Sequence, residues 1–289
     1  MQCLQESGHE NIVRVFGWSG WKHCLGLVVE HCPGGNLGNL LLNVNAVVTP
    51  VLKLRIASDI AKGLSFIHNL NTSNEKKQIV HSDIKPENVL LTEDIRCKVS
   101  DFGSARIATT TLIASKQVVK DGFNPPPMTF VYAAPEKLKN PFAHPRCAHD
   151  VHSFGMLLYT VLARSLPHVQ NKETFVEAVI KGARPDLDEI EEDESTVETN
   201  PNEQEIKRIL KTAAHRCWQT EASKRPDMIG VRDQLQNLLN QQNREEIVKS
   251  VKKVSANLDI CTPTTDNRRV VPLSQFLPEK GTFEVGMLP

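Results

Sequence analysis

Four polar side chains with the chemistry of phosphate transfer lie close together in the chain. They are Asp83, Lys85, Asn88 and Asp101. Moving a phosphoryl group onto an alcohol requires a carboxylate that accepts the hydroxyl proton, oxygen ligands that hold magnesium and a cation beside the moving phosphate. Asp83 fits the first role, Asn88 and Asp101 fit the second, and Lys85 fits the third. The spacing therefore predicts a magnesium-dependent phosphotransfer site, with Asp83, Lys85 and Asn88 catalytic and with Asn88 and Asp101 as metal ligands.

Brief apolar segments flank these residues and would hold them in place. They predict three short strands, at residues 79–81, 89–91 and 97–100. The last two strands would return the chain so that Asp101 faces Asp83 and Asn88. Phe102 and Gly103 directly follow Asp101, as a hydrophobic anchor and a flexible joint beside a metal ligand.

The first part of the chain reads as strands followed by a long helix. Two β-branched segments, 12–16 and 25–30, predict a strand pair joined by a turn, and Pro33 then begins a chain break. A helix is predicted from Pro50, because Thr49 suits the N-cap and apolar residues then recur every three or four positions. The same period returns in four later segments, 150–164, 172–182, 204–217 and 227–241.

Three segments lack such a pattern. Residues 101–135 show little periodicity, and the prolines at 125–127 exclude a helix there. The acidic run 189–194 is typical of a solvated loop. After residue 241 the sequence turns polar, so we expect 242–289 to form a partly disordered tail.

The composition argues against several classes of protein. Lys and Arg together number 34, as do Asp and Glu, so no net charge favours nucleic acid as a partner. The seven cysteines are odd in number and contain no C-x-x-C pair, which predicts reduced thiols rather than disulfides or a zinc site. Residues 1–6 do not resemble a signal peptide, and no apolar run reaches the ~20 residues of a membrane span. We therefore expect a cytoplasmic protein without a membrane span.

The predicted phosphotransfer site also matches a known family. Residues 81–88 and 101–103 resemble the catalytic loop and the D-F-G motif of eukaryotic protein kinases, in the same order and at the same spacing. Later segments agree with this resemblance. Residues 129–136 resemble the A-P-E motif that ends the activation segment, 150–155 resemble the central buried helix, and 217–226 resemble the late helical part.

The resemblance implies an α+β, two-lobed protein kinase fold over residues 1–241, with an incomplete small β lobe and a mainly helical large lobe. The small-lobe remnant would span 1–30, the hinge 30–36 and the large lobe 37–241. It also implies ATP and Mg²⁺ as cofactors and a protein as the substrate. Residues 85–88 resemble the serine/threonine form of the catalytic loop, and the late helical part resembles the tyrosine-kinase-like group.

The resemblance further assigns roles to individual residues. The ATP site would include Asp101 and four residues of the hinge and the pocket floor, Val29, Glu30, Cys32 and Leu90. The activation segment would carry Asp101, Phe102, Gly103, Thr129 and Glu136. Three residues would have structural roles, His81, Asp150 and Arg225. Asp150 would hold the backbone of the catalytic loop, and Arg225 would pair with Glu136.

Two departures from the family pattern bear on activity. Ser82 stands where most kinases carry an arginine that pairs with a phosphate on the activation segment, so we expect no switching by that route. The sequence contains no G-x-G-x-x-G loop, and the helix glutamate of the small lobe would fall just before Met1. We therefore expect a fragment of an active kinase rather than a natural short form. For the chain as it stands, we expect weak nucleotide binding and phosphotransfer near background.

Two functions follow from these observations. The first is a serine/threonine protein kinase that transfers the γ-phosphate of ATP to protein hydroxyls, favoured by the intact Asp83, Asn88 and Asp101. The alternative is a catalytically impaired pseudokinase or scaffold module, favoured by the missing glycine-rich loop and ATP-anchoring lysine.

Overall fold

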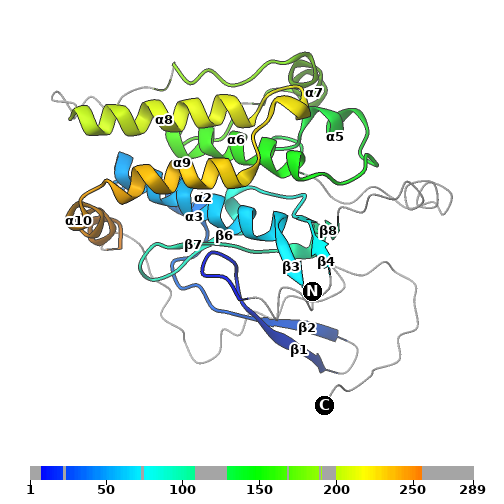
Figure 1. The fold of residues 1–289 in the computed structure, drawn as a ribbon, viewed down its shortest axis with the longest axis horizontal. Coiled ribbons are helices and arrows are strands. Elements are labelled where there is room, and N and C mark those ends of the chain that lie inside the picture. Colours follow the sequence, from blue (N-terminus) through cyan, green and yellow to red (C-terminus); the bar gives the residue numbers. More distant parts are fainter. Residues whose placement is uncertain are drawn as a thin grey trace.

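Helices make up most of the structure, and a pair of strands lies beside them (Figure 1). The computed structural model describes residues 8–21, 24–72, 75–107, 129–167, 169–188, 190 and 200–255. The helices belong to a large lobe, and β1 (Val15–Trp21) and β2 (Cys24–Val29) are the described strands of a small β lobe. This arrangement confirms the predicted α+β fold with a mainly helical large lobe.

The strand pair differs in its bounds from the prediction. β1 and β2 are antiparallel, with Trp18 opposite Leu27 and a bulge between Val15 and Gly17. The predicted strand pair is confirmed, but the predicted bounds of its first strand were wrong, because β1 starts later than 12–16 and continues through the predicted turn. The aromatic residues of this segment suit a strand, and they outweigh its glycines.

The segment before β1 joins the large lobe instead. Val13 N–H donates to Val99 O (2.9 Å), and Val99 N–H donates to Asn11 O (2.9 Å). The Asn11 side-chain amide donates to Cys97 O (2.9 Å). Gly63 permits this close approach, because a Cβ atom there would lie 2.7 Å from Asn11 O. The segment thus ties the strand pair to the strands and the helix that carry the site.

The segment after β2 crosses to the large lobe and starts a short helix. Gly34 N–H donates to Leu91 O (2.9 Å). A side chain at Gly34 would collide with the backbone oxygens of Leu91 and Thr92. Asn36 then caps α2 (Leu37–Leu42). The sequence predicted the break at Pro33 but missed α2, which spans fewer than two full helical turns and shows no clear period.

The helix α3 (Pro50–His68) is the centre of the large lobe. Thr49 caps it as predicted, and its hydroxyl accepts a hydrogen bond from Leu52 N–H (3.4 Å). Most side chains of α3 are buried, and the helix packs against four later ones. Four helices confirm the period predicted for the later segments; they are α6 (Cys147–Ala163), α7 (Lys172–Lys181), α8 (Pro201–Cys217) and α9 (Met228–Asn240).

Short strand pairs and turns form the side of the large lobe that faces the strand pair β1–β2. The predicted strands correspond to β5 (Ile79–Val80), β6 (Val89–Leu91) and β7 (Cys97–Val99). β6 pairs with β7, and β5 pairs with β8 (Arg106–Ile107). The turns beside them are η1 (Pro86–Asn88) and η2 (Phe102–Ser104). The sequence did not predict one further hairpin, β3 (Leu70–Thr72) with β4 (Glu75–Lys77).

The segment predicted as a tail begins with a helix. α10 (Arg244–Ser255) packs against α3, and the Thr49 hydroxyl donates to Ser250 Oγ (2.9 Å). Six of the twelve residues of α10 are exposed, so the composition of this segment is polar and its apolar stripe escaped the prediction. Two further short helices complete the lobe, α5 (Pro135–Lys139) and η3 (Ala222–Lys224).

Several predictions fall on residues that the structure leaves undescribed. These are residues 108–128 of the activation segment, nearly all of the acidic run 189–194, and residues 256–289 of the tail. Within the described ranges, no helix has both the length and the apolar composition needed to span a bilayer. Cys32, Cys97, Cys147 and Cys217 are free thiols.

Candidate active site

A buried carboxylate on α6 holds the backbone of the catalytic loop. Asp150 is fully buried, and its Oδ2 accepts hydrogen bonds from His81 N–H (2.7 Å) and from the His68 ring (2.8 Å). Its Oδ1 accepts a hydrogen bond from Ser82 N–H (2.8 Å). Ser82 has a φ of 70°, which costs a non-glycine residue free energy. The two backbone contacts with Asp150 stabilise this conformation.

The His68–Asp150 pair is ionised in the folded protein. Burial alone would lower the pKa of His68, but hydrogen bonding with Asp150 and Cys147 raises it to about 9. Burial alone would raise the pKa of Asp150, yet the hydrogen bond with His68 keeps it below its usual 3.8. A cation and an anion in direct contact therefore lie in the core, directly beneath the loop that carries Asp83.

This pair should make stability depend on pH. His68 has an unfolded pKa of 6.5 and a folded pKa of about 9, so its contribution is complete below pH 6.5 and is lost as pH rises through 9. We expect the free energy of unfolding to fall by a few kcal/mol across that range. A His68→Gln variant should show a much smaller decrease. Urea titrations at pH 6.5, 7.5, 8.5 and 9 measure how the free energy of unfolding changes with pH in wild type and in the variant.

The control for this experiment is a histidine on the surface. His215 on α8 is exposed, so His215→Gln should keep the wild-type pH dependence. Thiols that ionise in the unfolded chain lower stability at high pH equally in all three proteins. An identical slope in wild type and His68→Gln would therefore contradict the assignment of an ionised pair.

The His81 ring connects the catalytic loop to the D-F-G segment. Its Nε2 lies 2.8 Å from Ser100 O, and its Nδ1 accepts a hydrogen bond from Asp83 N–H (3.3 Å). The ring also packs against Phe102, with 4.9 Å between the ring centroids. These contacts orient the backbone of Asp83 relative to the residues that follow β7.

The carboxylate of Asp83 lies at the centre of the candidate site. Its Oδ2 is 2.7 Å from Lys85 Nζ and accepts a hydrogen bond from the Asn88 amide (3.0 Å). Its Oδ1 accepts a hydrogen bond from the Thr129 hydroxyl (3.0 Å), which itself accepts one from Lys85 Nζ (2.9 Å). The structure therefore brings together the three predicted catalytic residues and adds Thr129 to them.

The side chain of Asn88 has a defined orientation. It is buried, and its Nδ2 donates to both the backbone carbonyl (2.8 Å) and the carboxylate (3.0 Å) of Asp83. Both amide hydrogens are thereby used, so the nitrogen and oxygen positions cannot be exchanged without losing both bonds. The Oδ1 atom is left as an acceptor.

Asp101 lies next to Asn88 because β6 and β7 pair. Ser100 N–H donates to Asn88 O (2.8 Å), and the Ser100 hydroxyl donates to the same atom (2.9 Å). Asp101 follows with a φ of 59°, and its exposed side chain accepts a hydrogen bond from Gly103 N–H (3.3 Å). Carboxylate and amide oxygens are the donors that magnesium prefers, so Asn88 Oδ1 and Asp101 fit the predicted metal.

The predicted nucleotide residues lie around the crossing between the lobes. Glu30 N–H donates to Arg14 O (2.8 Å), so this amide is not available to adenine. Among the described residues, neither the carbonyl of Glu30 nor the N–H of Cys32 takes part in a backbone hydrogen bond. Val29 is partly exposed at the end of β2, and Leu90 is half-buried in β6. The two free backbone groups remain the predicted adenine contacts.

A buried ion pair closes the activation segment. Arg225 donates two hydrogen bonds to Glu136, of 2.7 and 2.8 Å, and three to backbone carbonyls. All five guanidinium N–H groups are thereby satisfied. Burial would raise the pKa of Glu136, but Arg225 holds it below its usual 4.5. His149 also lies near Glu136 (3.5 Å), yet burial lowers the pKa of His149 to about 4 and leaves it neutral at pH 7.

Sequence reasoning missed two residues of this site. His68 was not singled out in the sequence, and no sequence signal links it to Asp150, because the two lie 82 positions apart. Thr129 was assigned to the activation segment, but its contacts with Asp83 and Lys85 were not foreseen. The sequence feature that could have identified Thr129 is its hydroxyl, which lies shortly before the residues Ala134, Pro135 and Glu136.

The two-lobed fold and this arrangement of carboxylates, lysine and asparagine are those of protein kinases. The family model for the protein kinase domain matches residues 1–241, and the chain belongs to this family.

The relatives include two serine/threonine-protein kinases and a receptor kinase. The chain is 30% identical to the serine/threonine-protein kinase BIK1 of Arabidopsis thaliana, over 87% of its own length and 62% of that protein's. It is 27% identical to receptor-interacting serine/threonine-protein kinase 1 of Homo sapiens, over 86% and 36%. A probable L-type lectin-domain containing receptor kinase of Arabidopsis thaliana is 35% identical, over 61% and 24%. The chain thus spans less than two thirds of each of these relatives.

Proposed function

We propose that this domain transfers the γ-phosphate of ATP to serine or threonine hydroxyls of a protein substrate. The observation that supports this most is the arrangement of hydrogen bonds at Asp83. Asp83, Lys85 and Asn88 are each held by contacts that leave one chemically suitable group unused.

Asp83 itself keeps room for an acceptor hydroxyl. A carboxylate has about four acceptor positions. Lys85 and Asn88 occupy two positions on Oδ2, and Thr129 occupies one on Oδ1. The remaining position on Oδ1 would accept the proton of the substrate alcohol as the oxygen attacks phosphorus.

Lys85 keeps one of its three N–H groups. One lies against Asp83 Oδ2 (2.7 Å), and another donates to the Thr129 hydroxyl (2.9 Å). The third is directed by these two contacts and would donate to a γ-phosphate oxygen, where negative charge must be stabilised during transfer.

Asn88 Oδ1 and Asp101 would hold magnesium, which neutralises charge on the phosphate oxygens when it is bound. Two protein oxygens are too few for a complete octahedral site, so the remaining ligands would be phosphate oxygens and water. Metal and nucleotide would therefore bind together. The hydrogen bonds from Asn88 Nδ2 to Asp83 couple the metal ligand to the base in one rigid unit.

The loop geometry supports activity without a phosphate on the activation segment. The usual arginine after the catalytic-loop histidine is replaced by Ser82, which cannot form a bidentate contact with a phosphate. The loop is held by Asp150 instead, through Ser82 N–H and His81 N–H.

Magnesium binding tests the proposal. In isothermal titration with ADP present, Asp101→Ala should weaken Mg²⁺ binding by on the order of 10-fold or more, because one of two protein ligands is lost. Without ADP, wild type and variant should both bind Mg²⁺ too weakly to measure. Asp94→Ala is the matched control, since Asp94 is exposed in the turn between β6 and β7 and should leave Mg²⁺ binding unchanged.

The alternative function, a scaffold module without catalysis, makes the opposite prediction. A scaffold has no need for a metal site, so nucleotide-dependent Mg²⁺ binding would be absent or equal in wild type and Asp101→Ala. The titration should be repeated on a version extended upstream that supplies the glycine-rich loop and the strand lysine. Absence of binding in both versions would contradict the proposed kinase.

A further inference from the structure

The helix α10 lies beyond residue 241, where the match to the protein kinase domain ends. One side of it is part of the core. Val254 is buried, Ile247 and Val251 pack against the main apolar cluster, and Ser250 bonds with Thr49 at the start of α3. The helix is therefore a fixed part of the large lobe, and its other side is presented to solvent in a defined orientation.

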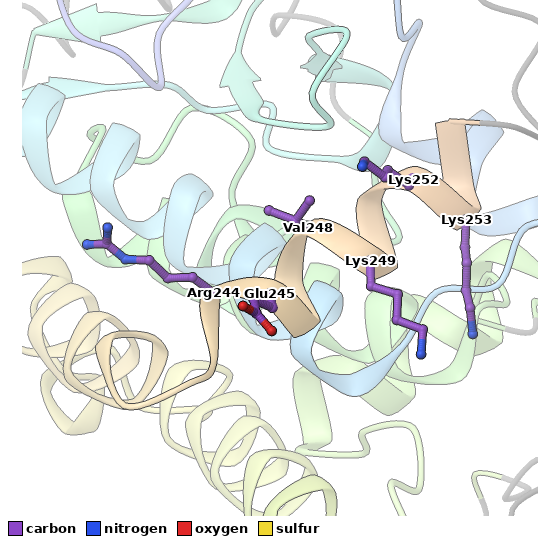
Figure 2. Close-up of a pocket in the computed structure, with 6 residues that line it drawn as sticks. All are labelled: Arg244, Glu245, Val248, Lys249, Lys252 and Lys253. Carbon is purple, nitrogen blue, oxygen red and sulfur yellow. The ribbon is translucent and has the colours of Figure 1, made fainter.

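The exposed side of α10 is basic. Six residues line a shallow hollow along it, and their side chains project from this one helix (Figure 2), Arg244, Glu245, Val248, Lys249, Lys252 and Lys253. Four of them are cations and one is an anion. We call this surface the α10 basic face.

Among the residues that the structure describes, lysines on α7 and η3 form ion pairs that the cations of the α10 basic face do not form. On α7, Lys181 lies 3.8 Å from Glu177, and on η3, Lys224 lies 3.0 Å from Glu221. In the described part of the chain, no such ion pair involves any cation of the α10 basic face. The first-turn acids and last-turn lysines of α10 suit the helix dipole, but Lys249 lies mid-helix and does not serve that purpose.

The α10 basic face lies far from the candidate active site. α10 is hydrogen-bonded to Thr49, the cap at the start of α3, whereas His68 at the other end of α3 contacts Asp150 beneath the catalytic loop. A helix of 19 residues is about 28 Å long. Figure 1 shows α10 at one end of the large lobe, with β8, the strand that pairs with β5, toward the other. A partner bound at α10 would leave the active site open.

We propose that the α10 basic face binds an anionic membrane surface. Four basic residues on one helix complement a sheet of anionic lipid headgroups. Three of the four are lysines, whose compact charge suits diffuse attraction to headgroups. Protein interfaces, in contrast, are poor in lysine and rich in aromatic residues, and the only apolar side chain of this face is Val248. The contact is peripheral, because the apolar side of α10 is already buried.

Vesicle sedimentation of the full 289-residue chain tests this proposal. The probe is vesicles of phosphatidylcholine with about 30% phosphatidylserine, compared with phosphatidylcholine alone. Each basic residue near an anionic surface contributes about fivefold to the partition coefficient. The triple variant Lys249→Gln, Lys252→Gln, Lys253→Gln should therefore bind the anionic vesicles on the order of 100-fold more weakly.

Two control proteins separate the α10 basic face from net charge and from folding. Replacing the same three lysines by arginine keeps the charge and should keep the binding. The triple variant Lys139→Gln, Lys181→Gln, Lys224→Gln removes the same charge from exposed positions elsewhere and should bind like wild type.

Three results would overturn the proposal. The first is equal sedimentation of wild type with neutral and anionic vesicles, and the second is equal loss of binding by the two glutamine triples. A polyglutamate peptide could also bind wild type more tightly than the anionic vesicles do, with loss only in the α10 triple. That last result would assign the face to an acidic protein partner.

Discussion

Asp83→Asn should lower the kcat of phosphotransfer by about 10²–10⁴ in a version of this domain extended upstream through the glycine-rich loop and the strand lysine. Asparagine has nearly the same shape, and its oxygen can still accept from Thr129 or from Lys85. It cannot take up the proton of the acceptor alcohol. Nucleotide affinity should change little, because no contact of Asp83 is directed at the nucleotide in the proposed arrangement. Steady-state kinetics with ATP and a serine peptide measure kcat and the KM for ATP separately.

Thr129 provides the matched control for Asp83. Thr129→Ser keeps the hydroxyl that lies between Asp83 and Lys85, so its kcat should stay within a few-fold of wild type. Thr129→Ala removes both hydrogen bonds and should lower kcat, because Lys85 and Asp83 each lose an orienting contact. A kcat for Asp83→Asn equal to that of wild type would contradict the role of Asp83 as the base.

Glu136→Ala should destabilise the fold by about 3 kcal/mol. The substitution leaves the guanidinium of Arg225, whose side chain is 0% exposed, without its counter-charge. Breaking a buried pair in this way costs roughly 3–5 kcal/mol, and the lower end applies because the Glu136 side chain is 29% exposed. Urea unfolding followed by tryptophan fluorescence gives the free energy of unfolding for both proteins.

A graded series makes this stability prediction sharper. Glu136→Gln keeps one acceptor for Arg225 and should cost less than Glu136→Ala. Glu177→Ala breaks the exposed pair with Lys181 on α7 and should leave the urea midpoint unchanged. Equal midpoints for Glu136→Ala and wild type would show that the pair does not hold the activation segment to the late helices.

The parts of the site that could be predicted are those encoded by neighbouring residues. Asp83, Lys85 and Asn88 lie within one loop, and Asp101 follows one hairpin later, so spacing alone brings them together. The start of helix α3 and its apolar period were predicted because Thr49 caps it and its apolar residues recur regularly. The ion pair of Arg225 with Glu136 was predicted only through the resemblance to the family, since the two residues lie 89 positions apart.

The remaining features depend on contacts that no local pattern encodes. The segment at Asn11 joins β7 because Gly63 leaves space for it, and neither residue shows this in the sequence. α10 was predicted as polar tail because a helix that rests on the surface of a lobe needs only a narrow apolar stripe. Its burial depends on the position of α3, which tertiary packing determines.

Transfer of labelled phosphate from ATP to a peptide with one hydroxyl is the most direct test of the central claim. The assay uses the extended domain, wild type beside Asp83→Asn, with a serine peptide and with the same peptide carrying tyrosine instead. The account predicts that wild type labels the serine peptide, that Asp83→Asn labels it at a rate lower by at least about 100-fold, and that the tyrosine peptide stays unlabelled. Equal labelling of both peptides, or no labelling of the serine peptide by wild type, would contradict it.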